Sequence, residues 1–69
     1  MRRFEYEDNK SWKYWEIEVR GEEVLTHYGR MDSPGQETVK VYTSTAEAQH
    51  AASKLVASKL KKGYVEVRV

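Results

Sequence analysis

The sequence lacks features on which several classes of protein depend. None of its 69 residues is cysteine, so disulfides, thiolate metal sites and thiol catalysis are excluded. Two histidines are too few for a three-histidine zinc site, and we expect neither a metal nor a cofactor. No apolar run exceeds three residues, so we expect no membrane-spanning segment. The reducing cytoplasm is the simplest location for such a chain.

Length and charge limit the interpretation further. A chain of this size buries only about 60% of its unfolded surface, which predicts a single domain over residues 1–69. The formal net charge is +1, so bulk electrostatics does not force a nucleic-acid or membrane partner. The C-terminal part, 40–69, is the basic part, with six Lys or Arg against two Asp or Glu.

Alternating polar and apolar residues predict strands in the first part of the chain. Trp15, Ile17 and Val19 alternate with charged residues, which predicts a sheet that is buried on one face and solvated on the other. Trp12 and Tyr14 are assigned to the polar face or its edge. The predicted strands cover residues 2–7, 13–20, 24–29 and 36–42. In the last of these Val39, Val41 and Tyr42 cannot all point inward, so either Tyr42 lies past a bulge or Val41 is exposed.

A helix is predicted over residues 45–62. Ser44 and Glu47 have the spacing of a capping box, and apolar residues then recur three and four positions apart. Lysines near the end and Gly63 after it are typical of a helix C terminus. With a short strand at 64–67, the fold class is α+β: a small antiparallel sheet of four to five strands with one C-terminal helix packed across one face. The residues expected to be largely buried are Trp15, Ile17, Val19, Leu55 and Tyr64.

Residues 29–35 form the longest irregular stretch, and their two glycines and single proline predict a loop with special backbone angles. Tyr28-Gly29-Arg30 places an aromatic ring, a flexible backbone position and a guanidinium where a strand opens into this loop. An aromatic ring can stack on a sugar or base, and arginine can bind phosphate bidentately, so this motif suits the end of a nucleic acid. The alternative is that Tyr28 packs on the sheet and Arg30 pairs with an acid.

Catalysis is not indicated, because no nucleophile, base and orienting group are suggested by the sequence. Glu16 and Glu18 are expected on the solvated face, and His27 and His50 are expected to have structural or surface roles. We therefore expect that the protein is not an enzyme.

Several short motifs occur in an order that is fairly specific. Tyr28-Gly29-Arg30, followed by Met31, resembles the Trp-Gly-Arg signature of the WGR domain, which occurs in DNA-dependent poly(ADP-ribose) polymerases and in small bacterial proteins. The resemblance covers nearly the whole chain and implies an antiparallel sheet with one helix across a face. The positions similar to structural parts of the family motif are Trp15, Gly29, Gly35, Tyr42, Lys59, Gly63 and Tyr64.

The resemblance implies a non-catalytic module that binds a DNA end or strand. In the polymerases the signature tryptophan contacts a sugar at a DNA break, and the arginine helps relay damage to neighbouring domains. Tyr28 occupies the tryptophan position and offers less stacking area. The residues predicted to bind nucleic acid are Tyr28, Arg30, Lys40 and Lys13. A protein-docking or regulatory module is the alternative, so the partners expected are DNA or a protein but not a membrane, and the oligomeric state is left open.

Overall fold

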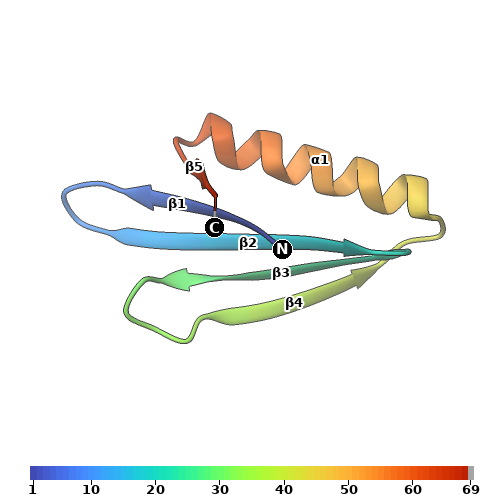
Figure 1. The fold of residues 1–69 in the computed structure, drawn as a ribbon, viewed down its shortest axis with the longest axis horizontal. Coiled ribbons are helices and arrows are strands. Elements are labelled where there is room, and N and C mark those ends of the chain that lie inside the picture. The colour runs from blue at the N-terminus through green and yellow to red at the C-terminus, as the bar shows by residue number, and fades with distance from the viewer. Residues whose placement is uncertain (69) are drawn as a thin grey trace.

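The computed structural model describes residues 1–68, which form five strands and one helix. In chain order the elements are β1 (Arg2–Glu7), β2 (Trp12–Arg20), β3 (Glu23–Arg30), β4 (Gln36–Val41), α1 (Thr45–Lys61) and β5 (Val65–Val67). The strands form one antiparallel sheet, and α1 runs along one face of it (Figure 1). The α+β architecture predicted from the sequence is confirmed, and each element begins and ends within one residue of its predicted bounds.

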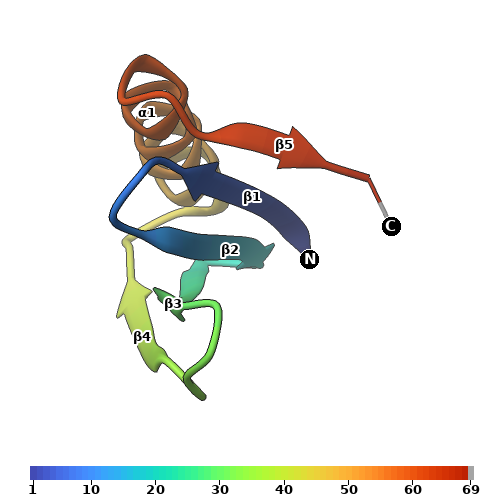
Figure 2. The ribbon, with the colours of Figure 1, turned by 90° about the vertical axis from the view of Figure 1, so that its left-hand side faces the viewer.

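The order of strands in the sheet is β4-β3-β2-β1-β5. The first four strands are neighbours in the sequence, whereas β5 returns after the helix and pairs with β1, where Phe4 lies opposite Glu66. Strands β2 and β3 are joined by a tight hairpin in which Arg20 pairs with Glu23 and Gly21 has a φ of +59°. Helix α1 packs against β2 and β3, and β4 lies at the far edge of the sheet from the helix (Figure 2).

The helix begins and ends as its capping residues predict. Ser44 is the N-cap, and its side-chain oxygen accepts a hydrogen bond of 3.1 Å from the backbone N–H of Glu47. The Glu47 carboxylate reaches back to the backbone N–H of Thr43, at 3.3 Å, one residue further than a capping box requires. Gly63 follows the last turn with a φ of +102°, in the left-handed region that the sequence predicts for it. Within residues 1–68 no helix has the length and apolar composition needed to cross a membrane.

The core lies between α1 and the face of the sheet that it covers, called here the helix-side face. Phe4 is fully buried, and Trp15 and Ile17 are each 3% exposed. The ring centroids of Phe4 and Trp15 lie 5.5 Å apart in a tilted arrangement. The burial predicted for Trp15 and Ile17 is confirmed, whereas Phe4 was not predicted as a core residue. The helix contributes its small side chains to this core, namely Ala48, Ala52 and Val56.

The prediction that Leu55 is largely buried is wrong, because 38% of it is exposed. The buried helix positions lie four residues apart, so the line facing the sheet passes through Val56 and leaves Leu55 on the flank. Val19 and Tyr64 were also predicted to be largely buried, but they are only half-buried and pack against the core from its margin.

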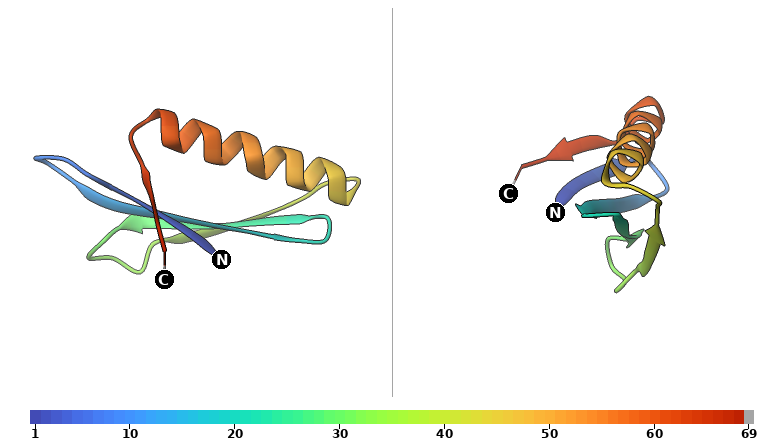
Figure 3. Two further views of the ribbon diagram at one scale, coloured as in Figure 1. Left: turned by 45° about the horizontal axis from the view of Figure 1, so that its top comes forward. Right: turned by 90° about the vertical axis from the view of Figure 1, so that its right-hand side faces the viewer.

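The opposite face of the sheet, called here the helix-free face, lies on the side away from α1 (Figure 3). This face is not simply solvated. Tyr14 lies on this face as predicted, but it is only 6% exposed, and Leu25, further along the same face, is 8% exposed. Tyr14 is buried because the loop at 31–35 folds back over it. Along β4, Val39 and Val41 are exposed while Tyr42 packs against the core, so of the two alternatives for this strand the exposure of Val41 is confirmed.

Candidate nucleic-acid interface

Strand β3 carries the signature residues to the end of the sheet where the loop at 31–35 begins. Side chains alternate between faces, so Tyr28 and Arg30 lie on the helix-side face while His27 and Gly29 belong to the helix-free face. Tyr28 is 38% exposed and the Arg30 side chain is 69% exposed. Arg30 Nε lies 3.9 Å from a carboxylate oxygen of Asp32, and this pair is too exposed to hold the guanidinium firmly. Both signature side chains are therefore accessible from solvent.

Lys13 lies beside Arg30 on the same face. The two residues are directly opposite each other in the β2–β3 ladder, which brings their side chains together. The Lys13 ammonium also lies 5.4 Å from the centroid of the Tyr6 ring, as in a cation–π contact. The predicted grouping of Tyr28, Arg30 and Lys13 thus corresponds to one surface.

The C-terminal end of α1 adds two cations to this surface. It lies at the same end of the molecule as the turn at 8–11 and the loop at 31–35 (Figure 1). The Lys59 ammonium lies 5.5 Å from the centroid of the Trp15 ring and 5.2 Å from that of Tyr64. A shallow groove joins Lys59 and Lys62 to Lys13, and the three are called here the lysine cluster.

The lysine cluster holds unneutralised positive charge. Burial lowers the pKa of Lys59, and the charges of Lys62 and Lys13 lower this pKa further. None of the three ammonium groups forms an ion pair within residues 1–68. A bound anion would relieve the repulsion among them. Sequence analysis gave Lys59 a structural role and Lys62 none in binding, because lysines in a last turn are equally explained by the helix dipole.

Asp8 lines the same groove but is engaged locally. One of its carboxylate oxygens accepts hydrogen bonds of 2.8 Å from the backbone N–H groups of Lys10 and Ser11, and the other accepts one of 3.0 Å from the Tyr6 hydroxyl. These hydrogen bonds, the backbone ones foremost, lower the pKa of Asp8 to about 2. The carboxylate therefore serves the β1–β2 turn and not the lysine cluster.

Lys40 is separated from the other predicted binding residues. It lies on the helix-side face of β4, four residues along the strand from Gln36, which is the cross-strand neighbour of Tyr28. Four residues of extended strand span about 13 Å. The Lys40 ammonium lies over the Tyr42 ring at 5.4 Å, near the start of the helix. Lys40 therefore belongs to the same face as Tyr28 but not to the same cluster.

The signature glycine is explained by close packing. Of the two loop glycines, Gly35 has a φ of +75°, whereas Gly29 has no positive φ, so the predicted special backbone angle applies to Gly35 alone. A Cβ atom on Gly29 would lie 2.7 Å from the Cα atom of Gly35. A Cβ on Gly35 would in turn lie 2.3 Å from the Tyr14 hydroxyl oxygen and 2.6 Å from the Tyr28 carbonyl oxygen. The glycines thus allow the loop to lie directly on β3.

A polar network on the helix-free face holds this loop in place. His27 Nδ1 lies 3.0 Å from Glu16 Oε1, and His27 Nε2 lies 2.7 Å from the Pro34 carbonyl oxygen. These two contacts, that with Glu16 foremost, raise the pKa of His27. The same carbonyl accepts a 3.1 Å hydrogen bond from the Tyr14 hydroxyl, and Arg3 donates to Glu16 at 3.1 Å. Sequence analysis placed Glu16 on a solvated face, but it is half-buried in this network.

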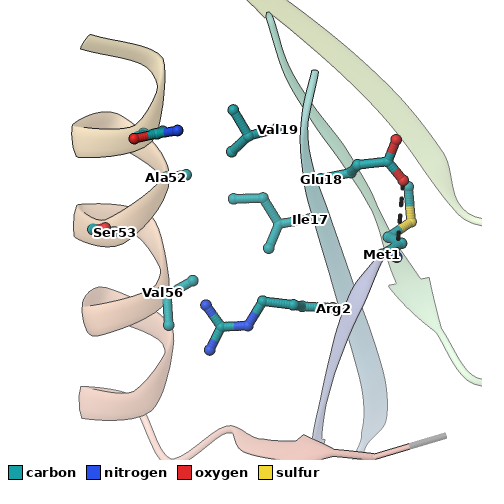
Figure 4. A pocket seen from close by; sticks show the side chains of 9 residues that line it. Met1, Arg2, Ile17, Glu18, Val19, Ala52, Ser53 and Val56 are labelled. Atoms are coloured by element: carbon teal, nitrogen blue, oxygen red, sulfur yellow. Dashed lines mark ion pairs between the residues drawn. The ribbon is translucent and has the colours of Figure 1, made fainter. Parts of the chain in front are cut away.

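A larger groove lies away from the signature residues. It has a volume of about 460 Å³ and opens between α1 and strands β1 and β2, where Ile17 and Val19 face Val56 (Figure 4). Arg2 points into it and forms two hydrogen bonds of 2.8 Å with Glu66. None of the predicted binding residues lines this groove. In the part of the chain that the structure describes, no three His, Asp or Glu side chains gather as metal ligands would.

Comparison with known proteins identifies the family. The model of the WGR domain matches residues 1–69. Protein YehF of Escherichia coli K12 is 42% identical over 66 residues, which are 96% of this chain and 24% of that protein. The uncharacterized protein YfeS of the same organism is 40% identical over 65 residues, which are 94% of this chain and 27% of that protein. A crystal structure of a protein from Bacteroides fragilis matches with a TM-score of 0.94 and 49% identity over 97% of this chain and 19% of that one. The chain therefore spans between about a fifth and just over a quarter of the length of these relatives, and it belongs to the WGR domain family.

Proposed function

We propose that this WGR domain is a non-catalytic module that binds the end or a strand of DNA. WGR domains bind nucleic acid in the poly(ADP-ribose) polymerases, so the family supports this class of ligand. The observation that carries the proposal is the grouping of an accessible aromatic ring, Tyr28, with Arg30 and the lysine cluster on one face. A nucleic-acid partner also fits the cytoplasmic location expected from the sequence, which stays a prediction.

The arrangement suggests how a DNA terminus would be held. Tyr28 would stack on the last sugar or base, because its ring lies beside the strand end and 38% of the residue is exposed. Arg30 would bind the backbone phosphate nearest the end of the strand with two hydrogen bonds. The lysine cluster, which begins at the cross-strand neighbour of Arg30, would neutralise the phosphates that follow. Because of the excess positive charge of the lysine cluster, we expect the DNA backbone to run across this part of the surface.

A titration of labelled single-stranded, blunt and nicked DNA, followed by fluorescence anisotropy at low salt, tests the proposal. We expect dissociation constants on the order of micromolar, because a single small module has few contacts. The four clustered cations predict that log affinity falls with log salt at a slope of roughly −3 to −4. A wild-type domain that binds none of these DNAs at low salt would refute the proposal.

Two sets of variants separate the contribution of the arginine charge from that of the tyrosine ring. Arg30→Ala should lower the affinity and reduce the salt slope by about one. Its matched control is Arg20→Ala, at the opposite end of the sheet, where the arginine side chain is similarly exposed, at 63%. Tyr28→Ala should weaken binding by about 1–3 kcal/mol without changing the salt slope, whereas Tyr28→Phe should keep the affinity and Tyr28→Trp should raise it.

A protein-docking role is the second candidate, favoured by the edge strand β4. Val39 and Val41 are 53% and 64% exposed on its helix-free face, and every residue of the strand is exposed. An edge strand with unpaired backbone groups and apolar side chains is a surface to which another chain can add a strand. If wild-type protein fails to bind DNA while Val39→Lys abolishes self-association or capture of a partner strand, the docking role replaces the DNA-binding one.

A further inference from the structure

We infer that His27 is a proton-operated latch that holds the loop at 31–35 beside the signature residues, so that DNA binding weakens when His27 loses its proton. This inference rests on the proposed function, since it concerns the regulation of that site. The latch lies on the helix-free face, directly behind Tyr28 and Arg30.

The hydrogen bonds of His27 require its charged form. Both ring nitrogens face oxygen atoms that can only accept: the Glu16 carboxylate at 3.0 Å and the Pro34 carbonyl at 2.7 Å. A neutral imidazole carries one N–H and can satisfy only one of these acceptors. With the second proton, His27 bridges β2 to the loop, and its side chain is 33% exposed, so the proton can exchange with solvent.

Deprotonation would release the Pro34 contact before the Glu16 contact. The remaining proton is held better by an ionised acceptor than by a neutral one, so it stays between His27 and Glu16. The lone pair on Nε2 would then face the Pro34 oxygen and repel it. The Tyr14 hydroxyl lies 3.4 Å from this nitrogen as well as 3.1 Å from the Pro34 oxygen, so it can turn its proton to the nitrogen instead. Loss of one proton thereby removes both donors to the Pro34 carbonyl oxygen.

The loop is connected to the signature residues by further hydrogen bonds. The backbone N–H and the hydroxyl of Ser33 donate to the Arg30 carbonyl oxygen at 3.0 Å and 2.9 Å. The backbone of the loop also lies against β3, because the Cα atom of Gly35 occupies the space that a Cβ atom on Gly29 would need. A loop that leaves Pro34 unanchored therefore leaves Tyr28 and Arg30 less well ordered. Binding then costs the additional free energy of restoring the competent arrangement.

The charges around His27 set the direction of the effect. Glu16 faces it from β2 and Glu37 from β4, and both stabilise the proton, whereas Arg3 of β1 acts on it indirectly through its bond to Glu16. The pKa of His27 is raised above the ordinary value of 6.5, mainly by the Glu16 hydrogen bond and then by Pro34. The latch is therefore closed at and below that pH and opens as pH rises through the raised pKa.

The test measures DNA affinity at about pH 6 and about pH 8.5, on either side of a raised histidine pKa, for the wild type, His27→Gln and the control His50→Gln. The probe is a blunt duplex with 5′-hydroxyl ends, because a terminal phosphate would itself titrate near pH 6. The titrations are done at physiological salt, where charges more than about 8 Å apart are largely screened from each other, so the direct attraction between the His27 charge and DNA is small. We expect the wild type and His50→Gln to lose roughly two- to tenfold in affinity at the higher pH, the ratio that corresponds to one hydrogen bond of ordinary net strength. His27→Gln should bind equally at both values.

A second measurement needs neither DNA nor a variant. In an NMR titration of the wild type, the His27 ring and the Gly35 amide should shift with the same midpoint, because the loop follows the ring. Separate midpoints, or a pH dependence of binding that His27→Gln retains, would overturn the latch. Binding by the wild type that does not change with pH would also overturn the latch, but it would leave the proposed function intact. Absence of binding at both pH values would refute the proposed function together with its regulation.

Discussion

The two tryptophans provide a test of how the sheet faces are assigned. They lie three residues apart on β2 and therefore point to opposite faces. Trp15 is 3% exposed and packs between Phe4 and the Lys59 side chain, whereas Trp12 is 52% exposed on the helix-free face. Replacing each by alanine removes the same atoms. The difference in the free energy of unfolding then reports burial alone.

We expect Trp15→Ala to lower the free energy of unfolding by about 3–5 kcal/mol. Burying an aromatic side chain removes roughly 150–250 Å² from water, which is worth about 4–6 kcal/mol at about 25 cal/mol per Å². Measured aromatic-to-alanine substitutions in cores cost about 3–5 kcal/mol, which we adopt. A chain of this length has a total stability of roughly 3–10 kcal/mol, so Trp15→Ala is close to unfolding. Trp12→Ala should cost about 1 kcal/mol or less.

Urea and thermal denaturation, followed by circular dichroism, measure both variants. One kcal/mol corresponds to about 4–8 °C in Tm for a domain of this size. Trp15→Phe retains a ring in the core and gives a graded value if Trp15→Ala does not fold. Equal destabilisation by Trp12→Ala and Trp15→Ala, or a larger effect of Trp12→Ala, would show that the helix does not cover the face of the sheet that carries Trp15.

Two further predictions concern the loop and the first turn. Gly35→Ala should destabilise the protein more than Gly21→Ala in the same denaturation assay. Both glycines have a positive φ, but a Cβ on Gly21 meets nothing within 4 Å, whereas one on Gly35 meets Tyr14 and Tyr28. Equal losses of stability in the two variants would contradict the close packing at Gly35. An NMR titration should give Asp8 a pKa of about 2, below its ordinary pKa of 3.8. Because the pKa is lowered in the folded protein, the stability that the Asp8 carboxylate adds is present above about pH 4 and is lost as pH falls through about 2. Asp8→Asn should lack this acid dependence.

The fold was predictable because its signals are local. Period-two alternation located the strands, and Ser44 and Gly63 marked the two ends of the helix. The helix face was predicted less well, because counting apolar residues gives Leu55 the same weight as Ala52. Small side chains let the helix approach the sheet closely, so the alanines face it and Leu55 lies on the flank.

The candidate site was only partly predictable because it combines residues that are distant in the sequence. Tyr28 and Arg30 are adjacent on one strand face and could be paired from the motif alone. Lys59 joins them because α1 ends beside the β1–β2 turn, and its position depends on how the helix lies across the sheet. Tyr14 was placed at the polar face or its edge because alternation shows which face a side chain occupies, but not that a loop covers that face.

The alternation of β3 also explains why a signature of three residues can carry both a contact surface and its support. Tyr28 and Arg30 point to the helix-side face, where a ligand has access, while His27 and Gly29 meet the loop on the other face. A single strand, β3, therefore links the ligand-accessible face to the face that holds the loop. A change in loop anchoring reaches Arg30 through the Ser33 hydrogen bonds to its carbonyl, over a single turn of chain. The glycine of the signature is the position that lets the loop come close enough for this connection.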